Sequence, residues 1–313
     1  MGKSTVVGEI QRDTYRIPWT NGLVMSAMTL LCWLWLGGVC SSSLSLLYRE
    51  EQSPLVSFLV STAVVFSPFL CMGLGLWLSL RYLVRMPLRR FVTDVPRFRW
   101  KLAIAALGIT LLCYGCFELI GYISNPDGYI LEFTINWGLR LTTLPILLVL
   151  IPFQTSCEEF LFRCFPARLL YGTLPETWGK RLSLCLLSAI LFLLPHLMNP
   201  DLLASETPFA VLAYYALFGL LSMMSATLTG GFEIALGIHA ANNLFVSMVC
   251  DYPESPLPGV PLMTDLHAVN GWMSCMQLVA TFAITGLTLY AINKRKLFTS
   301  RRGISGLDIR PHQ

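Results

Sequence analysis

Two adjacent glutamates, Glu158 and Glu159, interrupt an apolar stretch of this chain. A carboxylate inside hydrocarbon is costly, so it is rarely present without a partner or a function. Two of the four histidines, His196 and His239, lie in other apolar stretches. Glutamate and histidine both serve as general acids and bases. The three stretches together indicate proton-transfer chemistry performed inside a membrane.

The spacing around the glutamates assigns them different roles. Glu159 and Arg163 are four residues apart, so on a helix they share a face and can form an ion pair. Glu158 points about 100° away from Glu159, because a helix has 3.6 residues per turn. Glu158 would therefore be available as a general base. Taken alone, the two glutamates also fit a helix end at the cytoplasmic interface with no function.

Each histidine has a neighbour one helical turn away. Phe192 precedes His196 by four residues, and Pro195 predicts a kink that would tilt this histidine toward the bundle interior. His239 and Asn243 are also four residues apart, and together they could supply the hydrogen-bond donors of an oxyanion site. Taken singly, each pair also fits polar contacts that join neighbouring helices.

The three motifs together resemble a known family. The order E-E-x-x-x-R, F-x-x-x-H and H-x-x-x-N, on separate membrane helices, is similar to the CPBP family. This family contains the CAAX-prenyl-protease and bacteriocin-processing intramembrane proteases, including the Rce1-type glutamate peptidases. All three motifs are intact, and the resemblance covers about residues 135–250, the expected catalytic core.

The resemblance implies catalytic roles for four residues. Glu158 and His196 would bind and activate a water molecule. His239 and Asn243 would stabilise the oxyanion of the tetrahedral intermediate. The implied mechanism uses no metal or other cofactor. One glutamate and two histidines could also ligate zinc, so a zinc-dependent peptidase stays open.

The resemblance gives three further residues supporting roles. Glu159 and Arg163 would hold the shape of the site, in agreement with the ion pair that their spacing predicts. Phe192 would shape the pocket.

Two other acidic residues near apolar segments, Glu118 and Glu233, belong to no motif, and we assign them to packing or to the interface.

The composition identifies the elements that must position these residues. Of 313 residues, 55% are hydrophobic and 13% are charged, with a mean hydropathy of +0.62. Soluble domains have about 25% charged residues. We therefore expect one all-α membrane domain, residues 1–313, with about eight transmembrane helices. The predicted spans are 22–47, 55–80, 102–123, 138–157, 182–199, 207–229, 232–250 and 270–292.

The distribution of lysine and arginine predicts the orientation of these spans. Basic residues crowd both tails, the connection after the second span and the connection after the fourth. Residues 124–139, 200–206 and 251–269 contain none. Because cytoplasmic connections carry the excess of basic residues, both termini are expected in the cytoplasm. The net charge of +4 is explained by this topology and does not indicate nucleic-acid binding.

The functional prediction is an integral, multi-pass endopeptidase of the lipid bilayer. Glu158 follows the predicted span 138–157, so the site is expected near the cytoplasmic face and open toward it. The substrate would be a peptide or a protein terminus, including lipidated or membrane-associated ones. Two alternatives are a non-catalytic immunity or scaffold protein of the same family, and a transporter that couples to protons through its carboxylates.

Overall fold

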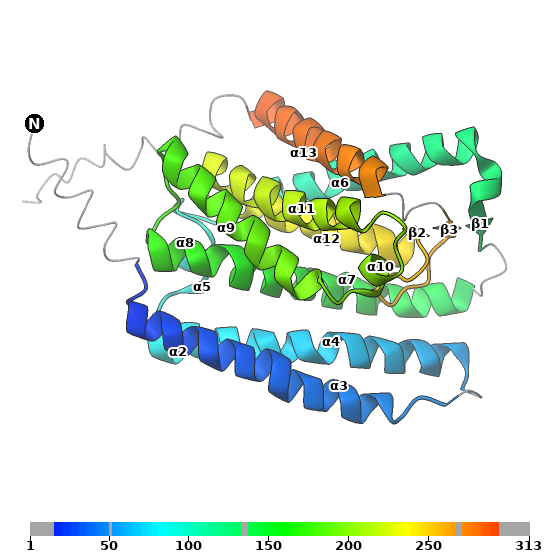
Figure 1. Ribbon diagram of the computed structural model, residues 1–313, viewed down its shortest axis with the longest axis horizontal. Coiled ribbons are helices and arrows are strands. Elements are labelled where there is room, and N and C mark those ends of the chain that lie inside the picture. The colour runs from blue at the N-terminus through cyan, green and yellow to red at the C-terminus, as the bar shows by residue number, and fades with distance from the viewer. Residues whose placement is uncertain (1–15, 50–51, 133–136, 267–270, 294–313) are drawn as a thin grey trace, which may run out of the picture.

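The protein is an elongated bundle of helices that run along one common axis (Figure 1). The structure is a computed structural model that describes residues 16–49, 52–132, 137–266 and 271–293. A small sheet lies at one end of the bundle, which we call the sheet end. The connection from Arg81 to Lys101 lies at the opposite end, which we call the basic end.

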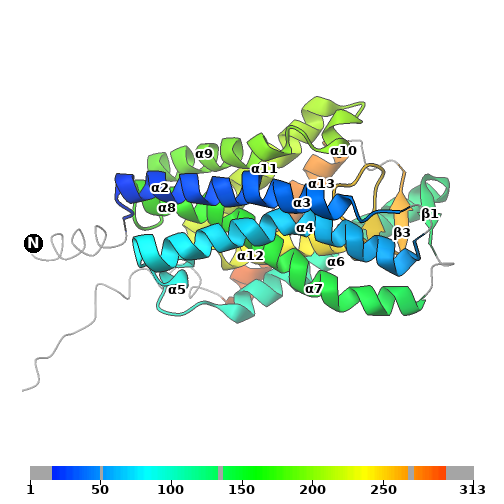
Figure 2. The same cartoon turned by 90° about the horizontal axis from the view of Figure 1, so that it is seen from below.

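The N-terminal half supplies three long helical segments. Its elements are α2 (Trp19–Leu30), a π-helical segment (Leu31–Leu36), α3 (Gly37–Ser45), α4 (Pro54–Leu78), a second π-helical segment (Ser79–Val84), α5 (Leu88–Val92) and α6 (Trp100–Ser124). The helices α2 and α3 lie end to end in one continuous run, which packs beside α4 along one flank of the bundle (Figure 2). The short helix α5 crosses the basic end.

The C-terminal half contains every motif singled out from the sequence. Its helices are α7 (Trp137–Glu159), α8 (Phe165–Leu170), α9 (Trp178–His196), α10 (Pro200–Leu203), α11 (Pro208–Thr229), α12 (Glu233–Met248) and α13 (Gly271–Asn293). A 3-10 turn (Pro126–Gly128) and three short strands, β1 (Tyr129–Leu131), β2 (Cys250–Asp251) and β3 (Met263–Asp265), cover the sheet end. Strand β3 pairs antiparallel with β1 and parallel with β2.

The predicted fold class is confirmed, with one helix of a different character from that expected. Within the described residues, seven helical segments are long and apolar enough to cross a membrane, and they match seven of the predicted spans. The remaining prediction, 232–250, corresponds to α12, which has 16 residues and spans about 24 Å. None of its residues is exposed. Its apolar sequence therefore reflects burial among other helices and not contact with lipid.

The helix that carries the two glutamates is longer than the sequence predicts. Helix α7 does not end after residue 157, because a π-helical segment (Phe160–Cys164) joins it to α8 in one continuous run from Trp137 to Leu170. About three further turns of helix follow Glu158 before that run ends. The predicted end of this span at residue 157 is therefore wrong, because apolarity alone did not show that the helix continues past its charged residues.

Ion pairs close the basic end of the bundle. Arg99 precedes α6 and pairs with Glu233 at the start of α12, with a nitrogen–oxygen distance of 2.7 Å. Arg168 in α8 pairs with Asp94 at 2.5 Å. The predicted packing role of Glu233 is confirmed by this contact. Apart from Arg16, the basic residues of the two tails lie outside the described residues.

Helix α12 depends on a close approach to α6 at Gly237. A Cβ atom at this position would overlap the carbonyl oxygen of Ala103 in the α6 backbone. We expect Gly237→Ala to lower the free energy of unfolding by about 1–3 kcal/mol, as overpacking of a tight core does. Denaturant unfolding of the purified protein in detergent measures this change. Gly108→Ala in α6 is the control, since nothing lies within 4 Å of its Cβ. Equal effects of the two substitutions would contradict the expectation.

Candidate active site

One imidazole connects the two adjacent glutamates. The Nε2 atom of His239, in α12, lies 3.3 Å from Oε2 of Glu158, at the end of α7. Its Nδ1 atom lies 2.8 Å from Oε1 of Glu159. All three side chains are buried. The first and third motifs, which are 80 residues apart in sequence, therefore meet at this histidine.

The ion pair predicted from spacing is present behind this contact. Arg163 donates to Glu159, and neither residue is exposed to any degree. The guanidinium carbon of Arg163 lies 4.3 Å from the ring centroid of Phe192 and 5.8 Å from that of Phe218. A cation over an aromatic face is stabilised, most strongly where water is excluded. Arg163 and His239 thus both bind the same carboxylate oxygen of Glu159, Oε1.

His196 is held in one orientation by its neighbours. Its Nδ1 atom lies 2.6 Å from the backbone oxygen of Phe192, and a carbonyl can only accept, so Nδ1 carries a proton. In the neutral imidazole, Nε2 is then the acceptor. The ring packs against those of Phe192 and Tyr215, with centroid distances of 4.5 and 4.1 Å. Pro195 is the penultimate residue of α9, so the helix ends here instead of continuing through a kink.

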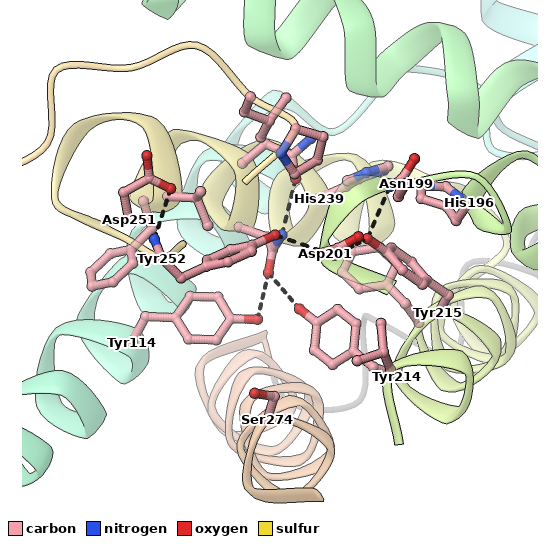
Figure 3. Close-up of a pocket in the computed structure, with 18 of the residues that line it drawn as sticks. Tyr114, His196, Asn199, Asp201, Tyr214, Tyr215, His239, Asp251, Tyr252 and Ser274 are labelled. Carbon is pink, nitrogen blue, oxygen red and sulfur yellow. Dashed lines mark hydrogen bonds between the residues drawn. The ribbon is translucent and has the colours of Figure 1, made fainter. Parts of the chain in front are cut away.

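A chain of hydrogen bonds fixes the amide of Asn243. The hydroxyls of Tyr114 and Tyr214 each donate to Oδ1 of Asn242 at 2.9 Å, and Figure 3 shows them converging from α6 and α11. Asn242 then donates to Oδ1 of Asn243 at 2.9 Å, and Asn243 donates to Oε1 of Gln154 at 3.0 Å. The amino group of Asn243 has two N–H donors, and the one that does not bind Gln154 can serve a ligand.

A second polar network secures the other side of His196. Tyr215 packs against that imidazole and donates to Oδ2 of Asp201 at 2.6 Å. Asn199 donates to the Tyr215 hydroxyl at 3.0 Å, and the Tyr252 hydroxyl lies 3.5 Å from the same Asp201 oxygen (Figure 3). Burial raises the pKa of Tyr252 well above its ordinary value, so its hydroxyl stays a donor. Asp201 is 7% exposed and is satisfied by these donors.

The side chains predicted from the motifs meet around one cavity of about 360 Å³. Five of them line it: Glu158, Phe192, His196, His239 and Asn243. The other two, Glu159 and Arg163, lie behind its wall. The cavity joins α7, α9, α11 and α12, with α4, α6 and α13 completing its walls. A carboxylate, two imidazoles and an amide therefore face a common space that is large enough for a peptide group and water.

Sequence reasoning missed several polar residues of this cavity. Gln154 is four residues before Glu158, so the helical spacing that paired the other motif residues could have revealed it. Asn242 is adjacent to a motif residue. By contrast, Asp201 and Tyr215 belong to a connection and a helix without a motif, and no sequence spacing relates them to His196. Glu118, assigned to packing, also lines the cavity and accepts from Tyr129 at 3.1 Å.

The cavity extends to the sheet end of the bundle. Its outer lining includes Glu118, Asp251, Tyr252, Leu257 and Asp265, which lie in or beside β2, β3 and the neighbouring connections. The sequence predicts that the site opens at the face where the basic connections lie. That prediction is wrong, because the structure places the outer part of the cavity and the basic connections at opposite ends. The direction of opening depends on how loops and helix ends pack, which local spacing does not specify.

Comparison with known proteins agrees with the motifs. Residues 139–245 match the family model described as Type II CAAX prenyl endopeptidase Rce1-like. The chain is also 26% identical over 281 residues to the uncharacterized protein YyaK of Bacillus subtilis (strain 168), which covers 86% of this chain and 92% of YyaK. No solved structure matches the chain. The family model therefore matches the part of the chain that carries all three motifs, and the resemblance to Rce1-like CAAX endopeptidases expected from those motifs is confirmed.

Proposed function

We propose that the protein is an intramembrane endopeptidase in which Glu158 activates the attacking water. The observation that carries this proposal is the contact between Glu158 and His239, buried and facing a cavity that His196 and Asn243 also line. The match to an endopeptidase family supports the reaction class. A carboxylate with this position can accept a proton from a water molecule in the cavity.

The proposed reaction begins with attack of water on the peptide carbonyl. Glu158 accepts one proton from the water while the water oxygen bonds to the carbonyl carbon. The carbonyl oxygen then becomes an oxyanion. The acceptor nitrogen of His196 orients the same water through its second proton. The amino group of Asn243 donates to the oxyanion, and a fixed donor of this kind contributes about 10²–10³ in rate. The carbon–nitrogen bond then breaks, and the leaving amine takes the proton from Glu158.

His239 has a role at two stages of this scheme. Its position between two carboxylates favours donation from both ring nitrogens, so it first orients Glu158. Once Glu158 has taken the proton from water, it is neutral and attracts the Nε2 proton less strongly. The same N–H then becomes available to the oxyanion that forms beside it. Glu159 and Arg163 keep His239 in place throughout these steps.

A zinc ion does not fit the described residues. A catalytic zinc takes three protein ligands. Among residues 16–49, 52–132, 137–266 and 271–293, no three His, Cys, Asp or Glu side chains gather as a metal site would require. Both ring nitrogens of His239 also face carboxylates. We therefore derive no step through a metal, and the absence of a metal requirement is part of the proposal.

Cleavage by purified protein tests this proposal. We expect the detergent-solubilised protein to cleave members of a quenched-fluorescence peptide library, with rates that are unchanged within about twofold by a zinc chelator. Glu158→Gln, prepared in the same way, provides the background rate. Loss of cleavage on chelation, with recovery on added zinc, would contradict the glutamate mechanism. No cleavage of any peptide, together with a cellular phenotype that survives Glu158→Gln, would favour a scaffold.

A further inference from the structure

The basic side chains of the described chain gather at one end of the bundle. At the sheet end, only Arg49 and Arg140 occur among the described residues, and Arg140 donates to the backbone oxygens of Glu132 and Val260. The others lie at the basic end, apart from the internal Arg163: Arg16, Arg81, Arg85, Arg89, Arg90, Arg97, Arg99, Lys101, Arg168, Lys180 and Arg181. Cytoplasmic connections carry this excess in multi-pass proteins. The basic end therefore corresponds to the cytoplasmic face.

The path from the site to the basic end is closed by packed side chains. Phe91, Cys164 and Phe232 are entirely buried between the glutamates and that end, and Phe162 is 7% exposed. The ring of Phe91 packs against that of Phe160 with a centroid distance of 6.0 Å. The ion pairs of Arg99 and Arg168 lie beyond this layer. These side chains leave no open path through which a peptide could pass, because protein interiors are close-packed.

The opposite path leads along the cavity to the sheet end. Its outer lining contains partly exposed residues of the connections that have no lysine or arginine, among them Asp251, Tyr252 and Leu257. The lining also differs in charge from the basic end.

It includes Glu118, Asp201 and other carboxylates, and no described lining residue is Lys or Arg. A segment entering this way meets negative charge along its route.

We infer that the substrate enters from the non-cytoplasmic side, as a peptide segment exposed at the outer membrane face that carries positive and not negative charge near the scissile bond. This inference rests on the proposed function for its reaction, and on the distribution of charge and packing for its direction. It deepens the peptide class of substrate to exported segments or outer loops of membrane proteins. Like charges juxtaposed with the lining would disfavour binding of an acidic segment.

Cysteine labelling in intact cells tests the direction without requiring activity. Leu257→Cys places a thiol in the outer lining of the cavity, and Gly179→Cys places one at the basic end, where nothing lies within 4 Å of the added Cβ. The parent protein gives the background of the ten native cysteines. We expect a membrane-impermeant maleimide to label Leu257→Cys in intact cells and Gly179→Cys only after permeabilisation. The reverse pattern would overturn the inference.

A sided reporter then tests the direction of cleavage. A basic peptide that the purified protein cleaves is fused to a single-span anchor, so that it faces either the cytoplasm or the outer side. We expect at least tenfold more cleavage in the outer orientation. Equal or cytoplasmic cleavage would overturn the inference while leaving the proposed reaction intact. If purified protein cleaves nothing, the proposed function fails, and the labelling result still reports the direction.

Charge exchange in the peptide tests the remaining part of the inference. We expect kcat/KM to fall at least about tenfold when lysine near the scissile bond is replaced by glutamate, since a charge reversal near a carboxylate changes affinity by more than 1.4 kcal/mol. The double variant Glu118→Gln with Asp251→Asn should show a smaller difference in kcat/KM between the lysine and glutamate peptides. Equal cleavage of both peptides by the parent protein would remove the charge preference.

Discussion

Glu158→Gln is expected to lower kcat/KM for peptide cleavage by about 10²–10⁴-fold, the contribution of a positioned general base. Glutamine has the size and shape of glutamate, but it cannot take a proton from water at neutral pH. It can still hydrogen-bond to His239, so the local packing is preserved. The measurement is steady-state cleavage of a library peptide by purified protein, with circular dichroism and thermal unfolding to show that the fold is unchanged.

The matched control for this substitution is Glu176→Gln, which makes the same chemical change at an exposed position between α8 and α9. It should leave kcat/KM within about twofold of the parent, because Glu176 lies outside the cavity. Retained activity in Glu158→Gln would show that another group activates the water. In cells, a scaffold would keep its phenotype with Glu158→Gln, whereas a protease would lose it.

The sequence predicted those parts of the site that depend on helical spacing. A separation of four residues places two side chains on one face whatever surrounds the helix. This is why the Glu159–Arg163 pair and the Phe192–His196 contact are found as predicted. Their convergence with α12 came from resemblance, since spacing within one helix does not report which helices meet.

The features that the sequence did not reveal arise from tertiary packing. Helix α12 has the composition of a span, yet it is short and enclosed by other helices, and a hydropathy pattern does not distinguish burial in protein from burial in lipid. The π-helical segment after Glu159 continues the helix beyond the two glutamates, and no residue type in the sequence predicts it. The end at which the cavity reaches the surface is set by connections and strands whose pairing is nonlocal.

Arg163→Met is expected to lower the free energy of unfolding by about 3–5 kcal/mol. Arg163 and Glu159 are both fully buried, and removal of the guanidinium leaves the Glu159 carboxylate in an apolar environment with the His239 contact but without its arginine partner. The substitution also removes the cation from the face of Phe192. Unfolding of the purified protein in mixed detergent measures the loss. Arg81→Met makes the same change at an exposed site, where the effect should stay within about 0.5 kcal/mol.

The double variant Arg163→Met with Glu159→Gln separates charge compensation from catalysis. Removal of both charges from a buried pair is often nearly neutral, so the double variant should unfold with a free energy closer to the parent than Arg163→Met does. Its activity should remain low, because His239 loses the carboxylate that holds its Nδ1 proton. Stability that recovers without activity would assign Glu159 to positioning of His239. If Arg163→Met unfolds no more easily than Arg81→Met, the buried pair does not stabilise the fold, and the orientation of His239 must rest on α12 packing alone.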